Sequence, residues 1–457
     1  MEKISYSSIR NSKNLPLPVY FNQKKVDPIR DISQEYILKE KGAQKMNKKY
    51  TAMISILMAG TVLLAGCQKA PRQDNTLTKP IDDVAALGEF LPAGAELLTP
   101  KKAEKKQSIY MEDLNKDGNQ EALLLYRDPN DNRQVHMMFL IKENGAWQKK
   151  ADMETGFIDV DTFDLADLDG NGTQEVTLGG GLSDSGHDNQ LYIYELQNGT
   201  LEQKADLSYD TLQISDFNDD QIPDLMVLSK KENEMRTARL YSYAEGRINP
   251  ISEIELDPEG SLEHVALGTL VDGKKALFAD SGIGAHSMLT EIIVYENGNL
   301  KKVGDPSDSI LMKPYPLYSR DINGDGIVEV GGMYIPKGYE DAAMADIPFL
   351  YTYKDYCSDG SFQTVEERYS DSGRHFYVTI PTELHENVTI KRLDNGIHLI
   401  STVGDKVLFE VKWAPKDAVP ANSTLLGTAK DIVFYSEWKE ETKIPASAFH
   451  LMEEEIN

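Results

Sequence analysis

The chain has 457 residues, of which 40% are hydrophobic, so it is long enough and apolar enough for two or three domains with buried cores. Its 74 acidic residues outnumber its 48 basic ones, which gives a formal net charge of −26. This charge argues against nucleic acid as a partner and suits a protein that binds cations.

The N-terminal region contains the pattern of a targeting segment. In residues 46–68, MNKKYTAMISILMAGTVLLAGCQ, Lys48 and Lys49 precede an apolar stretch that is short for a bilayer span, and small residues lead into Cys67. This segment resembles a bacterial lipoprotein signal with its lipobox. The resemblance implies that residues 46–66 are a signal peptide and that lipidated Cys67 anchors an extracytoplasmic protein to the bacterial cell membrane. A buried helix, or a plain signal peptide with a chance cysteine, is the alternative.

Residues 1–45 are unexpected ahead of such a signal, because a signal peptide normally begins near the first methionine. We therefore expect translation to begin at Met46, with a short cytoplasmic extension as the alternative. Residues 67–84 are expected to form a tether after the lipidated cysteine. With Cys67 lipidated, Cys357 has no cysteine to pair with, so stability must come from the core or from metal.

A motif of alternating oxygen-bearing side chains recurs in the middle of the chain. DLNKDGNQE begins at Asp113, DLDGNGTQE at Asp167, DFNDDQIPD at Asp216 and DINGDGIVE at Asp321. Successive copies are roughly 50 residues apart and the last gap is about twice as long, which predicts a further copy near the middle of that gap. LGTLVDGKKALFAD lies there without the oxygen-bearing side chains. We number the loops of these five units 1 to 5.

Each motif is followed by an apolar run and a hairpin signal. The expected turn glycines are Gly145, Gly199, Gly246, Gly298 and, less regularly, Gly360. A unit of about 50 residues with four short strands, repeated in tandem, is typical of a β-propeller. The sequence therefore predicts a mainly β fold with about five four-stranded blades over residues 85–370. Six or seven blades are the alternative count, if terminal segments form irregular blades. A β-solenoid is the alternative fold, although its coils would repeat at shorter periods.

The spacing of the motif suits calcium chemistry. Calcium takes six to eight oxygen ligands, and D-x-[DN]-x-[DN]-G-x-x-[DE] points alternate side chains of a tight loop at one centre. An EF-hand places its bidentate glutamate at the twelfth position between helices, whereas here the acid at the ninth position begins a strand. The sequence predicts bound Ca²⁺ with a structural role, and polar turns without metal are the alternative.

These repeats resemble the FG-GAP/VCBS propeller family, the type found in integrin α-chains and bacterial surface proteins. The resemblance implies four ligand sets, in which the seventh residue contributes its backbone carbonyl. The sets are Asp113, Asn115, Asp117, Asn119 and Glu121; Asp167, Asp169, Asn171, Thr173 and Glu175; Asp216, Asn218, Asp220, Ile222 and Asp224; and Asp321, Asn323, Asp325, Ile327 and Glu329. Loop 3 departs from the pattern because Gln221 replaces the expected glycine.

Two further loops could contact a ligand. GLSDSGHDN and ADSGIGAHSM follow the inner strands of the second and fourth units, and they place Asp184, His187, Asp280, Ser281 and His286 on one expected propeller face. Flexible loops inherited from the repeat are the alternative. No nucleophile elbow, metalloprotease motif or phosphate-binding glycine loop is present, so the sequence does not predict an enzyme.

Residues 371–457 lie beyond the repeat and alternate apolar and polar residues, with Asn395 and Gly396 as an expected hairpin turn and a short helix expected near the end. They resemble PsbP-like domains, which implies a small α/β or β-sandwich domain. Together the patterns predict a calcium-stabilised surface lipoprotein that binds or scaffolds a protein or polysaccharide ligand. A surface enzyme acting on polysaccharide or peptide is the alternative.

Overall fold

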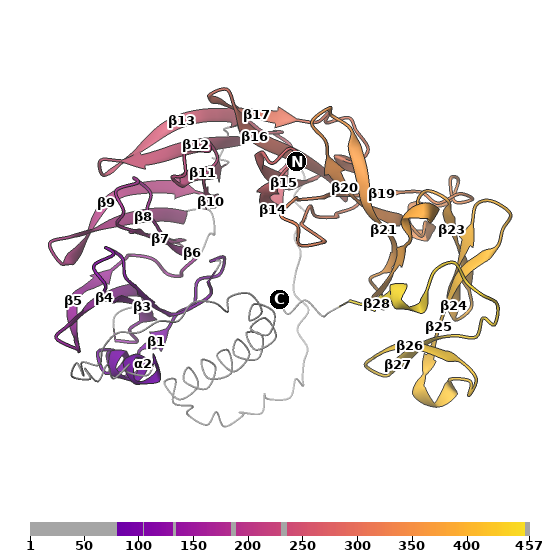
Figure 1. Ribbon diagram of the computed structural model, residues 1–457, viewed down its shortest axis with the longest axis horizontal. Helices are drawn as coiled ribbons and strands as arrows, with labels where there is room; N and C mark the ends of the chain where they lie inside the picture. The colour runs from indigo at the N-terminus through magenta and orange to yellow at the C-terminus, as the bar shows by residue number, and fades with distance from the viewer. Residues whose placement is uncertain (1–79, 104, 131–133, 184–188, 230–234, 453–457) are drawn as a thin grey trace, which may run out of the picture. The chain divides into compact units, whose positions relative to one another are not determined.

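The computed structural model describes residues 80–103, 105–130, 134–183, 189–229 and 235–452, and these residues form a series of antiparallel β-sheets (Figure 1). The described residues divide into two compact units, unit 1 from those in 80–100, 106–113 and 118–156 and unit 2 from the other described residues. The predicted signal segment, Cys67 and most of the tether lie outside the described residues. No helix within the described residues has the length and apolar character needed to cross a membrane.

Unit 1 contains the first blade. Its sheet has the order β1-β3-β4-β5, and β2 also pairs with β3. The bounds are β1 (Glu96–Leu97), β2 (Ile109–Glu112), β3 (Glu121–Arg127), β4 (Val135–Glu143) and β5 (Ala146–Glu154). The helix α2 (Pro80–Gly88) packs Leu87 against Leu124 of β3 and Met138 of β4. The inner strand β3 is almost wholly buried, as its continuous apolar run predicts.

Unit 2 contains four more blade sheets in chain order. The second is β6 (Thr162–Ala166), β7 (Glu175–Gly181), β8 (Asn189–Gln197) and β9 (Thr200–Tyr209), and the third is β10 (Thr211–Ser215), β11 (Asp224–Ser229), β12 (Thr237–Ala244) and β13 (Arg247–Glu255). The fourth is β14 (Ser261–Thr269), β15 (Lys275–Ile283), β16 (Ser287–Glu296) and β17 (Asn299–Val303), with β18 (Met312–Lys313) on β16. The fifth is β19 (Val330–Tyr334), β20 (Leu350–Tyr356), β21 (Phe362–Asp371) and β22 (Phe376–Ile380), extended by β28 (Phe449–Leu451).

Neighbouring sheets of unit 2 share apolar cores. Ile193 of the second blade packs in one cluster with Leu225 of the third. Leu240 of the third blade and Ile293 of the fourth share another cluster. Side chains between the sheets are therefore buried on both faces of the inner strands, as in a β-propeller, and this confirms the predicted fold class.

The hairpin turns confirm the sequence signals. Asn144 and Gly145, between β4 and β5, both have positive φ, at 52° and 82°. Asn198 and Gly199, between β8 and β9, have φ of 52° and 76°. Two consecutive positive φ values define the turn that matches the twist of the flanking strands. The same pair of signs occurs at the turns of the third and fourth blades.

The C-terminal part is a separate antiparallel sheet. Its order is β23-β24-β25-β27-β26, with bounds β23 (Val388–Leu393), β24 (Gly396–Ser401), β25 (Val407–Pro415), β26 (Thr424–Ala429) and β27 (Ile432–Ser436). The β23–β24 hairpin is confirmed, but Gly396 pairs with Leu393, so the two turn residues are Asp394 and Asn395. The expected terminal helix is confined to the 3-10 turn Ala446–Ala448, and β28 follows it. The other 3-10 turns are Met344–Asp346, Thr382–Leu384 and Lys416–Ala418.

Candidate metal centres

Loop 5 folds around the carboxylate of Asp321. Its Oδ1 accepts the N–H of Gly324 at 2.6 Å, and its Oδ2 accepts the N–H of Gly326 at 2.8 Å. Both glycines have positive φ, 81° and 87°, which lets the backbone turn tightly enough for these bonds. One oxygen each from Asp321, Asp325 and Glu329 lie within 4.8 Å of one another. The loop thus brings three of its predicted side-chain ligands together.

Loop 2 has the same construction. The N–H of Gly172 donates to Asp167 Oδ2 at 2.9 Å, and the N–H of Asn171 donates to Asp169 Oδ1 at 3.1 Å. Oxygens of Asp167, Asp169 and Glu175 again lie within 4.8 Å of one another. Two copies of the repeat, those with loops 2 and 5, therefore present equivalent clusters of three acidic side chains.

The ninth-position glutamates close these clusters from inside the blades. Glu175 is 1% exposed and Glu329 is 0% exposed, because each begins an inner strand or lies next to one. Glu175 Oε2 accepts the N–H of Leu168 at 2.7 Å, and Glu329 Oε2 accepts the N–H of Ile322 at 3.0 Å. Each loop is thereby fixed to the strand that follows it.

Each cluster also contains a buried oxygen that the fold leaves without a hydrogen bond. These atoms are Asp167 Oδ1 in loop 2 and Glu329 Oε1 in loop 5. Buried carboxylate oxygens are costly when unpaired, and a cation is one means of satisfying them. Three convergent carboxylates, one of which has an oxygen without a hydrogen bond, fit a hard, oxygen-binding cation such as Ca²⁺.

The raised pKa values of the buried glutamates in both clusters also favour a bound cation. Burial raises the pKa of Glu175 to about 7, with the negative charges of Asp169 and Asp167 adding to the effect. Burial also raises the pKa of Glu329, together with the charges of Asp355 and Asp325. Crowded buried acids raise one another's pKa when no positive charge lies among them. A bound divalent cation would supply that charge.

Asp355 is a neighbour of loop 5 that the sequence analysis did not single out. It belongs to β20, outside the motif, and its Oδ1 is buried without a hydrogen bond. Burial and the charge of Asp325 raise its pKa. No signal in the repeat pattern marks this residue, because it reaches the loop only through the pairing of β19 and β20.

Loop 3 forms the same turn as loops 2 and 5, but the carboxylate at its ninth position makes an additional hydrogen bond within the protein. Gln221 takes the positive φ, 71°, that glycine has in the other loops, and its N–H donates to Asp216 Oδ2 at 2.9 Å. The ninth-position acid, Asp224, accepts from the N–H of Phe217 at 3.0 Å and from Asn218 Nδ2 at 3.3 Å. Ile222, whose backbone carbonyl is a predicted calcium ligand, donates its N–H to Asp220 Oδ1 at 2.8 Å. Both oxygens of Asp224 are thus engaged within the protein.

Loop 1 also forms the expected turns. The N–H of Asp117 donates to Asn115 Oδ1 at 3.0 Å, and the N–H of Gly118 donates to Asp113 Oδ2 at 2.8 Å. Asn119 is exposed and Glu121 is buried. The division between the two units falls inside this loop. Among the described residues, only loops 2 and 5 bring three acidic ligands together.

Loop 4 forms a similar turn but lacks the alternating oxygen-bearing side chains of the motif. Gly273 has a φ of 83°, and the N–H of Lys274 donates to Asp272 Oδ1 at 3.2 Å. The ammonium of Lys274 lies 3.2 Å from Asp272 Oδ2, so this carboxylate is paired with a lysine of its own loop. The end of β14 nevertheless supports loop 5, because Thr269 donates its N–H and its hydroxyl to the carbonyl of Gly326, each at 3.0 Å.

The other candidate ligand residues are dispersed. Asp184 and His187 lie outside the described residues. His286 is exposed in the turn between β15 and β16, whereas Asp280 and Ser281 are fully buried in β15. Ser281 Oγ accepts from Arg236 at 2.8 Å. The two buried residues therefore take part in internal contacts and do not face solvent beside His286.

The sequence analysis also missed the partners of Asp280. Its carboxylate accepts from Thr290 Oγ1 at 2.5 Å and from the N–H of Ser319 at 2.7 Å, and it lies 3.1 Å from His264 Nδ1. The buried ammonium of Lys313 lies 4.0 Å away. These residues come from separate segments and share no motif, so only the three-dimensional structure brings them together.

Comparison with known proteins gives only distant structural likenesses. No family model matches the chain, and no curated protein matches it in sequence. A putative 6-phosphogluconolactonase from Bacteroides uniformis is 12% identical with a TM-score of 0.32, and covers 65% of this chain and 84% of its own. One from Bacteroides fragilis is 10% identical with a TM-score of 0.29, with coverages of 65% and 81%. TolB from Acinetobacter baumannii is 13% identical with a TM-score of 0.25, with coverages of 71% and 65%.

Proposed function

We propose that this chain is a lipid-anchored β-propeller protein of the bacterial envelope, in which calcium stabilises the blades and the folded part serves as a ligand-binding or scaffolding module. The observation that carries the calcium proposal is the pair of acidic clusters in loops 2 and 5. In each, three carboxylates converge within 4.8 Å and one buried oxygen has no partner.

The positions of the two acidic clusters support a structural role for a bound cation. Glu175 and Glu329 connect each loop to an inner strand of a blade, so a cation held there would tie the loop to the sheet. A site that binds only the folded chain stabilises it by roughly 1.4 kcal/mol when the ligand is at ten times its Kd. Two such sites would contribute about 3 kcal/mol, a substantial part of the 5–15 kcal/mol of a typical domain.

The placement at the envelope rests on residues 46–67, with their basic start, apolar stretch and Leu-Ala-Gly-Cys ending. The similarity of the loops to FG-GAP/VCBS repeats supports a binding role in the same location. Asp280 and Ser281, two of the residues considered for a surface-loop site, make internal hydrogen bonds, so the proposed ligand-binding role does not rest on them.

Calorimetric titration of the metal-free full chain with Ca²⁺ tests the proposal. We expect binding at two or more sites with dissociation constants on the order of 10⁻⁴ to 10⁻³ M. Asp321→Asn combined with Glu329→Gln should remove one site, and Asp167→Asn combined with Glu175→Gln should remove another. Glu383→Gln changes an exposed acid outside the loops and should leave the titration unchanged. No heat of binding in the parent protein would refute the calcium proposal.

A further inference from the structure

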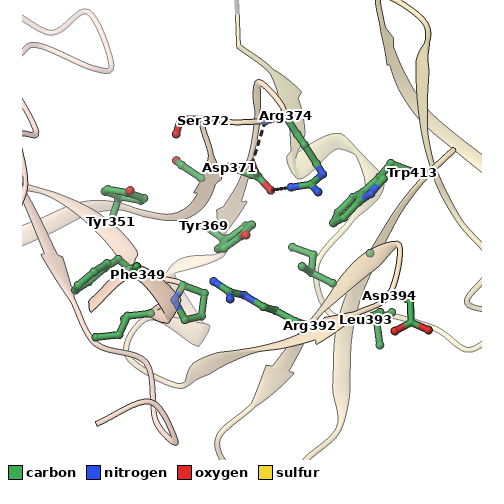
Figure 2. A pocket seen from close by; sticks show the side chains of 16 residues that line it. Phe349, Tyr351, Tyr369, Asp371, Ser372, Arg374, Arg392, Leu393, Asp394 and Trp413 are labelled. Atoms are coloured by element: carbon green, nitrogen blue, oxygen red, sulfur yellow. Dashed lines mark hydrogen bonds and ion pairs between the residues drawn. The ribbon is translucent and has the colours of Figure 1, made fainter. Parts of the chain in front are cut away.

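A cavity of about 540 Å³ lies within unit 2, away from the acidic loops. Its walls come from the fifth blade and the C-terminal sheet, and Figure 2 shows the side chains that face it. The residues that matter here are Phe349, Tyr351, Tyr369, Trp413, Arg374 and Arg392. We call this cavity the arginine pocket. Its volume is within the range of small-molecule sites.

Arg374 is held in place at one side of the arginine pocket. Its Nη1 donates to Asp371 Oδ2 at 3.1 Å, and its backbone N–H donates to Asp371 Oδ1 at 3.0 Å. The guanidinium lies 4.1 Å from the centre of the Trp413 ring (Figure 2). Asp371 and Trp413 belong to different sheets, so these contacts fix the side chain across the pocket.

Arg392 supplies a second positive charge with a different environment. It extends from β23 into the arginine pocket toward Tyr369, and Asp394 lies beyond Leu393, away from the Arg392 guanidinium (Figure 2). Within the described part of the chain, the guanidinium of Arg392 forms no ion pair or hydrogen bond. The residue is exposed, so its donors face solvent and can turn to an acceptor that enters the pocket.

Two guanidinium groups in one cavity are notable in a chain with a net charge of −26. Asp371 and Asp394 also line the pocket, so the formal charges of its lining balance. The case for an anionic ligand therefore rests on the arginine fork, which matches a carboxylate with two parallel hydrogen bonds. One guanidinium is fixed and the other is unpaired, so the pocket can take up a carboxylate without first breaking an ion pair at Arg392.

The other lining residues indicate which kind of molecule carries the carboxylate of the ligand. Phe349, Tyr351 and Tyr369 contribute aromatic rings to the lining, and Ser370 and Ser372 contribute hydroxyl groups. A sugar ring has C–H faces that pack on aromatic rings and a rim of hydroxyls that bonds to polar groups.

We infer that the arginine pocket binds an anionic sugar unit of the uronic-acid type, with Arg392 as the residue that takes the carboxylate. The inference names a ligand class for the binding module proposed above and rests on that proposal. It uses none of the residues of loops 2 and 5. The calcium sites and the sugar site can therefore be tested separately in one preparation.

The test is calorimetric titration of the full chain with trigalacturonate, with its methyl ester and with a tripeptide bearing a free carboxylate. We expect trigalacturonate to bind and the uncharged ester to bind at least ten-fold more weakly. Arg392→Gln should weaken trigalacturonate binding at least ten-fold, and Arg392→Lys should restore part of it. Lys391→Gln removes the same charge from the neighbouring exposed residue, which does not line the pocket, and should bind as the parent does.

Three results would overturn the inference. These are no binding of trigalacturonate, equal binding of the methyl ester, and parent-like affinity in Arg392→Gln. Preference for the tripeptide would reject the sugar class as well. A thermal melt of each variant with and without Ca²⁺ separates the two proposals. Calcium stabilisation without sugar binding rejects the arginine pocket alone, whereas a melt unaffected by calcium rejects the calcium proposal.

Discussion

The ammonium of Lys313 lies 4.0 Å from the carboxylate of Asp280, and neither side chain is exposed to solvent. Lys313 also donates to Thr290 Oγ1 at 2.9 Å and to the carbonyl of Gly331 at 2.5 Å. The pair therefore links the fourth blade to β19 of the fifth. Buried charges are tolerated only when they are paired and hydrogen-bonded, and both conditions are met here.

Replacement of Lys313 by methionine should destabilise the protein. The substitution leaves Asp280 buried without its positive partner, and losing one member of a buried pair typically costs about 3 kcal/mol or more. Urea unfolding at pH 7 measures the change. Lys406→Met removes an exposed lysine and should alter the free energy of unfolding little. Equal stability of Lys313→Met and the parent would show that the pair does not stabilise the fold.

The same pair predicts a pH dependence. Burial lowers the pKa of Lys313 to about 8 from 10.5, although Asp280 opposes the change. Between these two values the unfolded chain binds more protons at this group than the folded chain, so the stability that this group contributes rises with pH. The stability difference between the parent and Lys313→Met should therefore grow from pH 8 to pH 10.5, by up to about 3 kcal/mol. A constant or shrinking difference in urea unfolding would contradict the lowered pKa.

The glycines of the inner strands predict a second stability effect. A Cβ added at Gly180 would lie 2.4 Å from the carbonyl oxygen of Asp159 and 2.6 Å from the Phe157 ring. Overpacking of this kind usually costs 1–3 kcal/mol, so we expect Gly180→Ala to lose about 2 kcal/mol of unfolding free energy. Gly373→Ala is the matched control, since the nearest atom there is 3.5 Å away. Chemical denaturation measures the unfolding free energy of both variants. Equal losses of unfolding free energy in the two would contradict the steric explanation.

The proposed anchor predicts a change in location. If Cys67 carries the lipid, then Cys67→Ala should move the protein from the membrane fraction to the soluble fraction of a bacterial host. Cys357→Ala should remain with the membranes, because Cys357 lies in the folded part. Metabolic labelling with a fatty acid should mark the parent and Cys357→Ala but not Cys67→Ala. Labelled Cys67→Ala protein would contradict the anchor.

The blades could be predicted because their signals are local. An Asn-Gly pair between two apolar runs specifies its own turn, and Gly145 and Gly199 have the φ values that such turns need. The loops could be predicted only in part. Loop 3 has nearly the same pattern as loop 2, and Asp224 accepts from Phe217 as Glu175 does from Leu168, yet the shorter Asp224 also accepts from the Asn218 side chain.

The buried network and the arginine pocket could not be predicted from the pattern. Asp280 meets Lys313 and Ser319 through the packing of strands far apart in the sequence. The arginine pocket joins Arg374, from the turn between β21 and β22, to Trp413 of the C-terminal sheet. Neither position repeats along the chain, so periodicity carries no information about them.

The most direct test of the account is the melting temperature of the full chain with excess chelator and with millimolar Ca²⁺. We expect calcium to raise it by several degrees, because two sites would add about 3 kcal/mol to the free energy of unfolding. Glu329→Gln retains an oxygen to accept the N–H of Ile322 and removes the buried charge, so it should melt no lower than the parent in chelator and gain less from calcium. Identical melting curves of the parent with chelator and with Ca²⁺ would contradict the calcium-stabilised propeller.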